Sequence, residues 1–188
     1  MSTKYKVVIV GDSGVGKTCI ARRATIKQYS EFTVPTIGGA HFSLSVDIDQ
    51  KEVMLDIWDT AGQEEFRNIV PMFMRNAFYA IIVFDVTTVS SFSSVYSWAE
   101  FVKDNAPDCK IVLVGSKVDL ASQRVVSLVE AMDIAKKSPF ETFFETSSVT
   151  GIGIVELFDY IASNCSGTTV PQADVEICSE PVKKPGCC

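Results

Sequence analysis

The sequence lacks the features that mark several large classes of protein. Its 188 residues include one histidine and no Cys-x-x-Cys or Cys/His spacing, so no zinc site is predicted. Lysine and arginine (17) are outnumbered by aspartate and glutamate (23), and the net charge of -6 argues against binding nucleic acid or anionic lipid by charge. No apolar run is long enough to span a membrane, and residues 1–4 lead into a predicted strand without a signal peptide. We therefore expect a cytosolic body.

Cysteine is present without an evident framework. Three of the six cysteines, Cys19, Cys109 and Cys165, are scattered through predicted helices and strands, and we expect them to be small buried or half-buried thiols. Cys178 has no predicted role. Cys187 and Cys188 are the last two residues, and their position is considered below.

The hydrophobic pattern predicts an α/β fold. A hydrophobic content of 47% suffices for one substantial core, and we expect a single domain. Uninterrupted apolar runs at 7–10, 80–84 and 111–114 are typical of strands covered on both faces, and helix-like segments separate them. This alternation predicts a doubly wound, mainly parallel sheet with helices on both faces.

Other segments have recognisable ends. Apolar and polar residues alternate over 42–48, which with a turn at 49–52 and a strand at 53–58 predicts an antiparallel pair at the sheet edge. Ser127 and Glu130 predict a capping box, Pro107 ends a helix expected over 91–102, and apolar spacing predicts a last helix around 154–161. From residue 166 onward we expect a flexible linker.

A glycine-rich motif supplies the strongest functional prediction. Residues 11–18 fit the phosphate-loop pattern G-x-x-x-x-G-K-[ST] and follow the strand at 7–10. Glycines let the backbone turn its N–H groups toward an anion, Lys17 neutralises β- and γ-phosphates, and Thr18 offers its hydroxyl to Mg2+. The alternative, an ordinary glycine-rich turn, does not explain the preceding strand. The motif indicates a nucleotide-binding protein.

Polar residues far apart in sequence follow predicted strand ends. The carboxyl ends of parallel strands lie at one edge of a sheet, where ligands bind. Asp59 suits the outer sphere of a phosphate-bound Mg2+, although alone it is also consistent with a helix cap. Gly62 frees the backbone, and Gln63 has the donor and acceptor needed to orient a water molecule. The residues expected at this edge are Gly11, Asp59, Asp85, Gly115 and Thr146.

At this point the chain resembles the Ras superfamily of small GTPases, and within it the Rab branch, over residues 4–165 and again at the carboxyl terminus. The segments GDSGVGKT, PTIG, WDTAGQE and ETSS stand in order at the expected intervals. The resemblance implies a P-loop NTPase fold with a six-stranded sheet, a G domain over 1–165 and a hypervariable tail over 166–188. It also implies GTP hydrolysis that is slow alone and accelerated by an activating protein.

The resemblance assigns roles to individual residues. Thr36 is expected to ligate Mg2+ and contact the γ-phosphate, Gly62 to sense that phosphate through its N–H, and Gln63 to position the attacking water. Thr18, Thr36 and Asp59 form the implied magnesium site. The implied nucleotide contacts are Ser13, Gly14, Val15, Gly16, Lys17, Thr18, Cys19, Tyr29, Thr36, Gly62, Ser116, Lys117, Asp119, Ser147 and Ser148.

Base recognition departs from the family pattern at one residue. Ser116 stands where the N-K-x-D motif has asparagine. Asp119 accepts from guanine N1–H and the exocyclic amine, so a preference for guanine is expected to survive. The stem of Lys117 is expected to pack on the base and the Ser148 N–H to meet the guanine oxygen. Losing neutral hydrogen bonds worth about 0.5–1.5 kcal/mol each predicts weaker binding and faster GDP release than is usual.

The surface expected to bind effectors also departs from the pattern. His41 occupies the place of a phenylalanine that in Rab proteins contacts effectors together with two other aromatic residues, which Trp58 and Phe73 match. His41 is either a solvated strand residue or part of an altered effector surface that titrates near neutral pH. Residues 72–74 are apolar, which core packing and partner binding explain equally well.

The chain ends in Cys187-Cys188, which resembles the Rab terminus that receives two geranylgeranyl groups; the alternative is two unmodified thiols. Two lipids anchor stably where one does not, so we expect residence on the cytoplasmic face of an intracellular membrane, with a cytosolic pool.

Expected partners are an exchange factor, a GTPase-activating protein, a GDP-dissociation inhibitor and effectors, with the protein a monomer. Two rival functions are a module that binds nucleotide but hydrolyses little, and an ATP-using P-loop kinase, which Asp119 opposes.

Overall fold

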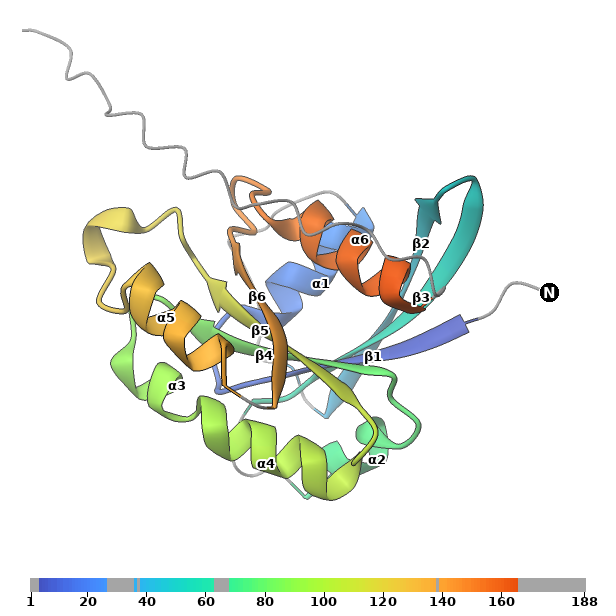
Figure 1. The fold of residues 1–188 in the computed structure, drawn as a ribbon, viewed down its shortest axis with the longest axis horizontal. Coiled ribbons are helices and arrows are strands. Elements are labelled where there is room, and N and C mark those ends of the chain that lie inside the picture. The colour runs from blue at the N-terminus through green and yellow to red at the C-terminus, as the bar shows by residue number, and fades with distance from the viewer. Residues whose placement is uncertain (1–3, 27–35, 37, 63–67, 138, 166–188) are drawn as a thin grey trace, which may run out of the picture.

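The computed structural model describes residues 4–26, 36, 38–62, 68–137 and 139–165. A six-stranded sheet with the order β2-β3-β1-β4-β5-β6 runs through its centre (Figure 1). All neighbouring strands are parallel except β2 and β3, which are antiparallel. The strands are β1 (Lys4–Val10), β2 (Gly39–Ile48), β3 (Lys51–Thr60), β4 (Tyr79–Asp85), β5 (Lys110–Ser116) and β6 (Phe140–Thr146).

Helices cover both faces of the sheet, as the sequence pattern predicts (Figure 1). Two of them, α1 (Lys17–Ile26) and α6 (Ile154–Cys165), lie on one face. The other face carries α2 (Val70–Met74), α3 (Val89–Ser93), α4 (Val95–Asn105) and α5 (Leu128–Ala135), with a short 3-10 turn at Ala121–Gln123 before α5.

The central strands are apolar throughout because both of their faces are covered. Along β1, Val7 and Ile9 face the core under α1 and α6, whereas Val8 and Val10 face the core under α2 to α5. Every residue of β4 is buried. Burial of apolar surface contributes about 25 cal/mol per Å2, so these two layers supply most of the driving force for folding. The doubly wound fold predicted from the sequence is confirmed.

The edge hairpin forms where alternation predicts it, with longer strands than expected. Asp49 and Gln50 both have positive φ (50° and 64°) and form a two-residue turn, so pairing already resumes between Ile48 and Lys51. Such turns match the twist of the flanking strands and tolerate aspartate better than most residues. The apolar side chains of β2 face the core, and its polar ones face out.

Local sequence signals predict two further helices, and the structure confirms the start of one and divides the other. The capping box of α5 is confirmed, since the Glu130 N–H donates to Ser127 Oγ (3.2 Å) and the Ser127 N–H to Glu130 Oε2 (2.9 Å). The single helix expected over 91–102 is divided at Ser94 into α3 and α4. Serine hydroxyls there donate to carbonyl oxygens three or four residues earlier, as Ser94 Oγ does to Ser90, and such bonds compete with regular helix pairing.

The hydrophobic pattern does not predict the bounds of β6, α2 or the 3-10 turn. For β6, only a strand end near Thr146 is predicted. The three internal cysteines behave as predicted, since Cys109 and Cys165 are buried and Cys19 is half-buried. Among the helices of the described ranges, none has the length and hydropathy needed to cross a lipid bilayer.

Candidate functional site

The carboxyl ends of five parallel strands meet at one edge of the sheet. Asp59 near the end of β3 is level with Ile9 of β1, two residues before Gly11. Further along the same edge, Asp85, Ser116 and Thr146 are paired side by side at the ends of β4, β5 and β6. Topology therefore gathers the polar residues that the sequence places far apart.

Lys17 is the first residue of α1 and is 6% exposed. Its ammonium donates to the carbonyl oxygens of Gly11 (2.7 Å) and Asp12 (2.6 Å), across the loop that precedes the helix. Burial lowers the pKa of Lys17 to about 8, while the charges of Asp59 and Asp12 act in the opposite direction. A poorly hydrated cation at a helix N-terminus is a strong attractor for phosphate.

Two hydroxyls and a carboxylate form a cluster beside Lys17. Thr18 Oγ1 lies 2.6 Å from Asp59 Oδ2 and 2.8 Å from Thr36 Oγ1, which is 3.2 Å from the same carboxylate oxygen. Asp59 is fully buried, and burial raises its pKa against the opposing hydrogen bonds and the charge of Lys17. Three segments of the chain, at residues 18, 36 and 59, are thus joined at one point.

This cluster fits a hard divalent cation. Asp59 Oδ1 is buried and has no hydrogen-bond partner among the described residues, so an acceptor is left over. Across the part of the chain that is described, no three His, Cys, Asp or Glu side chains gather to hold a metal alone. Hydroxyl and carboxylate oxygens that need additional ligands match Mg2+, which keeps waters and substrate phosphates in its coordination sphere.

Gly62 lies directly on the phosphate loop. A Cβ built at this residue would collide with Lys17 Nζ and lie 2.6 Å from the carbonyl carbon and oxygen of Asp12. Only glycine permits so close an approach. The Asp12 side chain in turn accepts a hydrogen bond from Trp98 Nε1 of α4 (2.8 Å). The segment that follows β3 is therefore in direct contact with the loop expected to hold phosphates.

The base side of the site is built from the ends of β5 and β6. Ser116 is buried, and its hydroxyl lies within hydrogen-bond distance of the carbonyl oxygens of Val15 (2.5 Å) and Phe84 (2.9 Å). Asp119 is exposed, and its Oδ1 accepts from Ser147 Oγ (2.5 Å), which leaves Oδ2 for a ligand. Ser147 itself is fully buried, and Ser148 beside it is half-buried.

Three aromatic rings form a cluster where the start of β2 pairs with the end of β3, on the face of the sheet that carries α2. The ring of His41 lies 4.9 Å from that of Trp58, which lies 5.4 Å from that of Phe73. The His41 side chain is 43% exposed, and its Nε2 is 3.4 Å from Asp56 Oδ1. Lys6 Nζ lies 5.1 Å from the centre of the Trp58 ring. The three residues matched to an effector surface from sequence are thus neighbours.

The remaining predicted residues divide into two groups. In the phosphate loop Ser13 and Gly14 are exposed, Val15 is buried and Gly16 is half-buried, while Cys19 follows in α1. Tyr29, Gln63, Cys187 and Cys188 lie outside the described residues. Sequence reasoning missed the contact between Trp98 and Asp12, because no pattern links side chains 86 residues apart.

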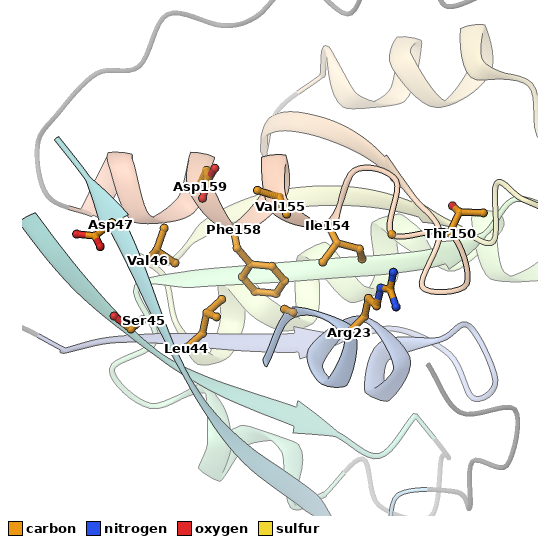
Figure 2. A pocket seen from close by; sticks show the side chains of 12 residues that line it. Arg23, Leu44, Ser45, Val46, Asp47, Thr150, Ile154, Val155, Phe158 and Asp159 are labelled. Atoms are coloured by element: carbon orange, nitrogen blue, oxygen red, sulfur yellow. The ribbon is translucent and has the colours of Figure 1, made fainter. Parts of the chain in front are cut away.

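A separate hollow of about 560 Å3 lies between β2, α1 and α6 (Figure 2). The side chain of Phe158 points into it above Leu44, and Arg23 lies at the end nearest Thr150. The hollow has no side chain in common with the phosphate loop, the hydroxyl cluster or the base side.

Comparison with known proteins decides the family. The model of the Ras family matches residues 6–166. The chain belongs to the Ras family. Ras family members bind guanine nucleotides and hydrolyse GTP, so the protein is a small GTPase. It is similar to "Ras-related protein Rab-4" of Dictyostelium discoideum, with 39% identity over 170 residues, which cover 90% of this chain and 80% of that protein. Within the Ras family the chain is thus Rab-like.

Proposed function

We propose that this GTPase is a Rab-type switch that cycles between GDP- and GTP-bound states and recruits effectors for intracellular vesicle trafficking. The observation that carries the proposal is the junction of Thr18, Thr36 and Asp59, with Gly62 resting on the phosphate loop beside it. Groups that touch a terminal phosphate from two separate segments make the surface of those segments depend on whether that phosphate is present.

Each residue at the strand edge has a proposed task. Lys17 holds the β- and γ-phosphates, with backbone contacts from Ser13, Gly14, Val15, Gly16 and Cys19. Thr18, Thr36 and Asp59 would together hold Mg2+. When bound, the metal neutralises the charge that develops on the transferred phosphoryl group.

On the proposed assignment, hydrolysis depends on groups of this chain that surround the terminal phosphate. The Gly62 N–H contacts the γ-phosphate, and Gln63 orients the attacking water. Loss of that phosphate removes the contacts of Thr36 and Gly62 together, and this changes the surface that the two segments present to partner proteins. A single-turnover assay tests the chemistry: Gln63→Leu removes both the donor and the acceptor, and we expect hydrolysis to slow while GTP affinity is retained.

The guanine base is assigned to Asp119, Lys117 and Ser148, with Ser147 orienting Asp119 and Tyr29 at the base edge. Asp119 offers its second carboxylate oxygen to the N1–H and the exocyclic amine, which adenine does not present together. We expect GTP, but not ATP, to displace bound GDP. Equal competition by the two triphosphates would contradict this assignment.

The partners follow from the surface and the tail. The cluster of His41, Trp58 and Phe73 is proposed to meet effectors, and an exchange factor, an activating protein and a GDP-dissociation inhibitor are proposed to act near the same segments. Prenylation of Cys187 and Cys188 would place the protein on the cytoplasmic face of an intracellular membrane. No nucleic-acid partner is proposed, because the net charge is -6.

The switch itself is tested by hydrogen exchange. With a non-cleavable triphosphate analogue, the amides around Thr36 and Gly62 should exchange more slowly than with GDP, because both residues then contact the terminal phosphate. Amides of β4, buried in either state, provide the internal control. Identical exchange around Thr36 and Gly62 in the two states would remove the basis of the switch.

A further inference from the structure

The buried carboxylate of Asp85 has no part in the roles proposed so far. It ends β4 and is 5% exposed. Its Oδ1 accepts from the N–H (2.8 Å) and the hydroxyl (2.7 Å) of Thr87, and its Oδ2 lies 2.6 Å from Lys117 Nζ. Burying a charge is costly, and apolar residues commonly replace buried ion pairs without loss of stability. A buried charge at a binding edge therefore needs a reason beyond folding.

Lys117 is held at both ends, at its backbone and at its ammonium group. At the backbone, Lys117 adopts a φ of 63°, which is uncommon for a residue other than glycine, and its carbonyl oxygen accepts from the Leu120 N–H (3.0 Å). At the tip, the ammonium is held by Asp85. Burial alone would raise the pKa of Asp85, but the hydrogen bonds from Lys117 and Thr87 and the charge of Lys117 lower it, so the carboxylate is ionised at neutral pH.

The neighbouring residue makes Lys117 more important in this chain. Ser116 directs its hydroxyl at the carbonyl oxygens of Val15 and Phe84, so that group is engaged by the backbone rather than facing a base. Of the adjacent side chains of the loop, Lys117 and Asp119 remain to meet the nucleotide. Asp119 accepts hydrogen bonds from the edge of the base, whereas the extended aliphatic stem of Lys117 covers the face of the base.

We propose that Asp85 is a positioning residue for nucleotide binding, which stretches the Lys117 side chain from the end of β5 to the end of β4 and so prepares a wall for the base. The inference rests on the proposed assignment of Lys117 to the base. A long side chain ordered before binding loses less conformational freedom on binding, which slows release of the ligand. Asp85 acts through Lys117 and does not touch the nucleotide.

Release of tritiated nucleotide tests the proposal. Asp85→Asn keeps the size of the side chain and an oxygen for Thr87 but removes the charge that holds Lys117. We expect GDP release about tenfold faster, equivalent to about 1.4 kcal/mol. Release of inosine diphosphate, which lacks the exocyclic amine read by Asp119, should accelerate by the same factor, because the lysine stem contacts the face of the ring and not its edge.

Two comparisons separate positioning from a merely structural role. In a Lys117→Met background, Asp85→Asn should change GDP release by less than about twofold, because no ammonium is left to hold. Thr87→Ala removes a hydroxyl from the same carboxylate but leaves the ion pair, and it should release GDP as the wild type does. Asp133→Asn, which breaks an exposed contact to Lys136, is the matched control.

The proposal would be overturned if Asp85→Asn released GDP at the wild-type rate. It would also be overturned if Asp85→Asn accelerated release in the Lys117→Met background as much as it does alone, or if Thr87→Ala accelerated release as much as Asp85→Asn does. If Asp85→Asn alone does not fold, the double variant is compared with Lys117→Met, and equal release rates are required. A wild-type protein that does not retain GDP would instead contradict the proposed base site. The two failures are therefore distinguishable.

Discussion

At the scale of single residues, the departure from the family pattern at Ser116 has a structural explanation. Asparagine has a longer side chain with both a donor and an acceptor, whereas the shorter serine hydroxyl lies, among the described residues, at hydrogen-bond distance from the main-chain oxygens of Val15 and Phe84. The serine therefore keeps the contact that supports the loop. The contact to the nucleotide is the one expected to be lost.

Ser116→Asn should slow GDP release. One restored neutral hydrogen bond is worth about 0.5–1.5 kcal/mol, which corresponds to about two- to tenfold. The rate is measured with tritiated GDP on filters, and Ser122→Asn in the exposed 3-10 turn is the control. A variant that releases GDP as fast as the wild type would show that the serine is not what limits binding.

Thiol reactivity is a second prediction at this scale. Burial raises the pKa of both Cys109 and Cys165 to about 12, so at pH 8 neither carries the thiolate that reacts. We expect iodoacetamide to leave both unmodified in the native GDP-bound protein for as long as the fold persists, and to modify them in urea. Peptide mass spectrometry provides the measurement, and rapid native labelling of Cys109 would contradict its burial.

Single residues were predictable from sequence where a short motif defines them. The spacing of residues 11–18 predicts a phosphate loop, and the structure brings Lys17, Thr18 and Asp59 together at its edge. The bonds from Asp85 to Lys117 and from Trp98 to Asp12 cross the fold and join residues that no local pattern relates. Such pairs become visible only when the strands are placed side by side.

At the scale of elements, helices and strands with a regular hydrophobic pattern are predicted better than segments rich in polar residues. The capping box correctly predicts where α5 begins, and the alternation of apolar and polar residues correctly predicts which side chains of β2 face the core. Apolar spacing predicts a single helix through the serine-rich stretch before α4, because that spacing contains no information on hydroxyls that bond to nearby carbonyl oxygens. Element type follows the hydrophobic pattern, and interruptions follow local hydrogen bonding.

The turn between β6 and α6 shows how an element supports the site. Gly153 has a φ of 70°, and a Cβ there would collide with the carbonyl oxygen of Glu145. Gly153→Ala should destabilise the protein by about 1–3 kcal/mol, which lowers Tm by about 2–12 °C. It should also speed GDP release, since Glu145 lies two residues before Ser147, whose hydroxyl donates to Asp119.

Thermal unfolding of the GDP-bound protein measures this effect. Val155→Ala, a small change at a residue that is 65% exposed, is the control and should shift Tm by less than about 2 °C. An alanine variant with the Tm and GDP release of the wild type would mean that the backbone of Glu145 moves aside at no cost.

At the scale of the whole molecule, the prediction concerns attachment to membranes. Attachment is proposed to depend on the thiols of Cys187 and Cys188. Two lipid chains anchor stably, whereas one gives reversible binding. We expect the double variant Cys187→Ser, Cys188→Ser to remain in the supernatant after membrane sedimentation from cells, and each single variant to distribute between the two fractions.

Cys178→Ser, which changes a third tail cysteine without touching the terminal pair, is the matched control and should sediment as the wild type does. Sedimentation of the double variant with membranes would mean that something other than lipid holds the protein there.

The placement of the two tryptophans gives the molecule a built-in optical reporter. Trp58 is half-buried and lies against His41 and Phe73, and Trp98 donates a hydrogen bond to Asp12, the phosphate-loop residue that Gly62 contacts. Selective excitation of indole therefore samples the effector-facing cluster and the nucleotide edge in the unlabelled protein. Trp58→Phe and Trp98→Phe each leave one emitter, so the two regions can be timed separately as GTP is turned over.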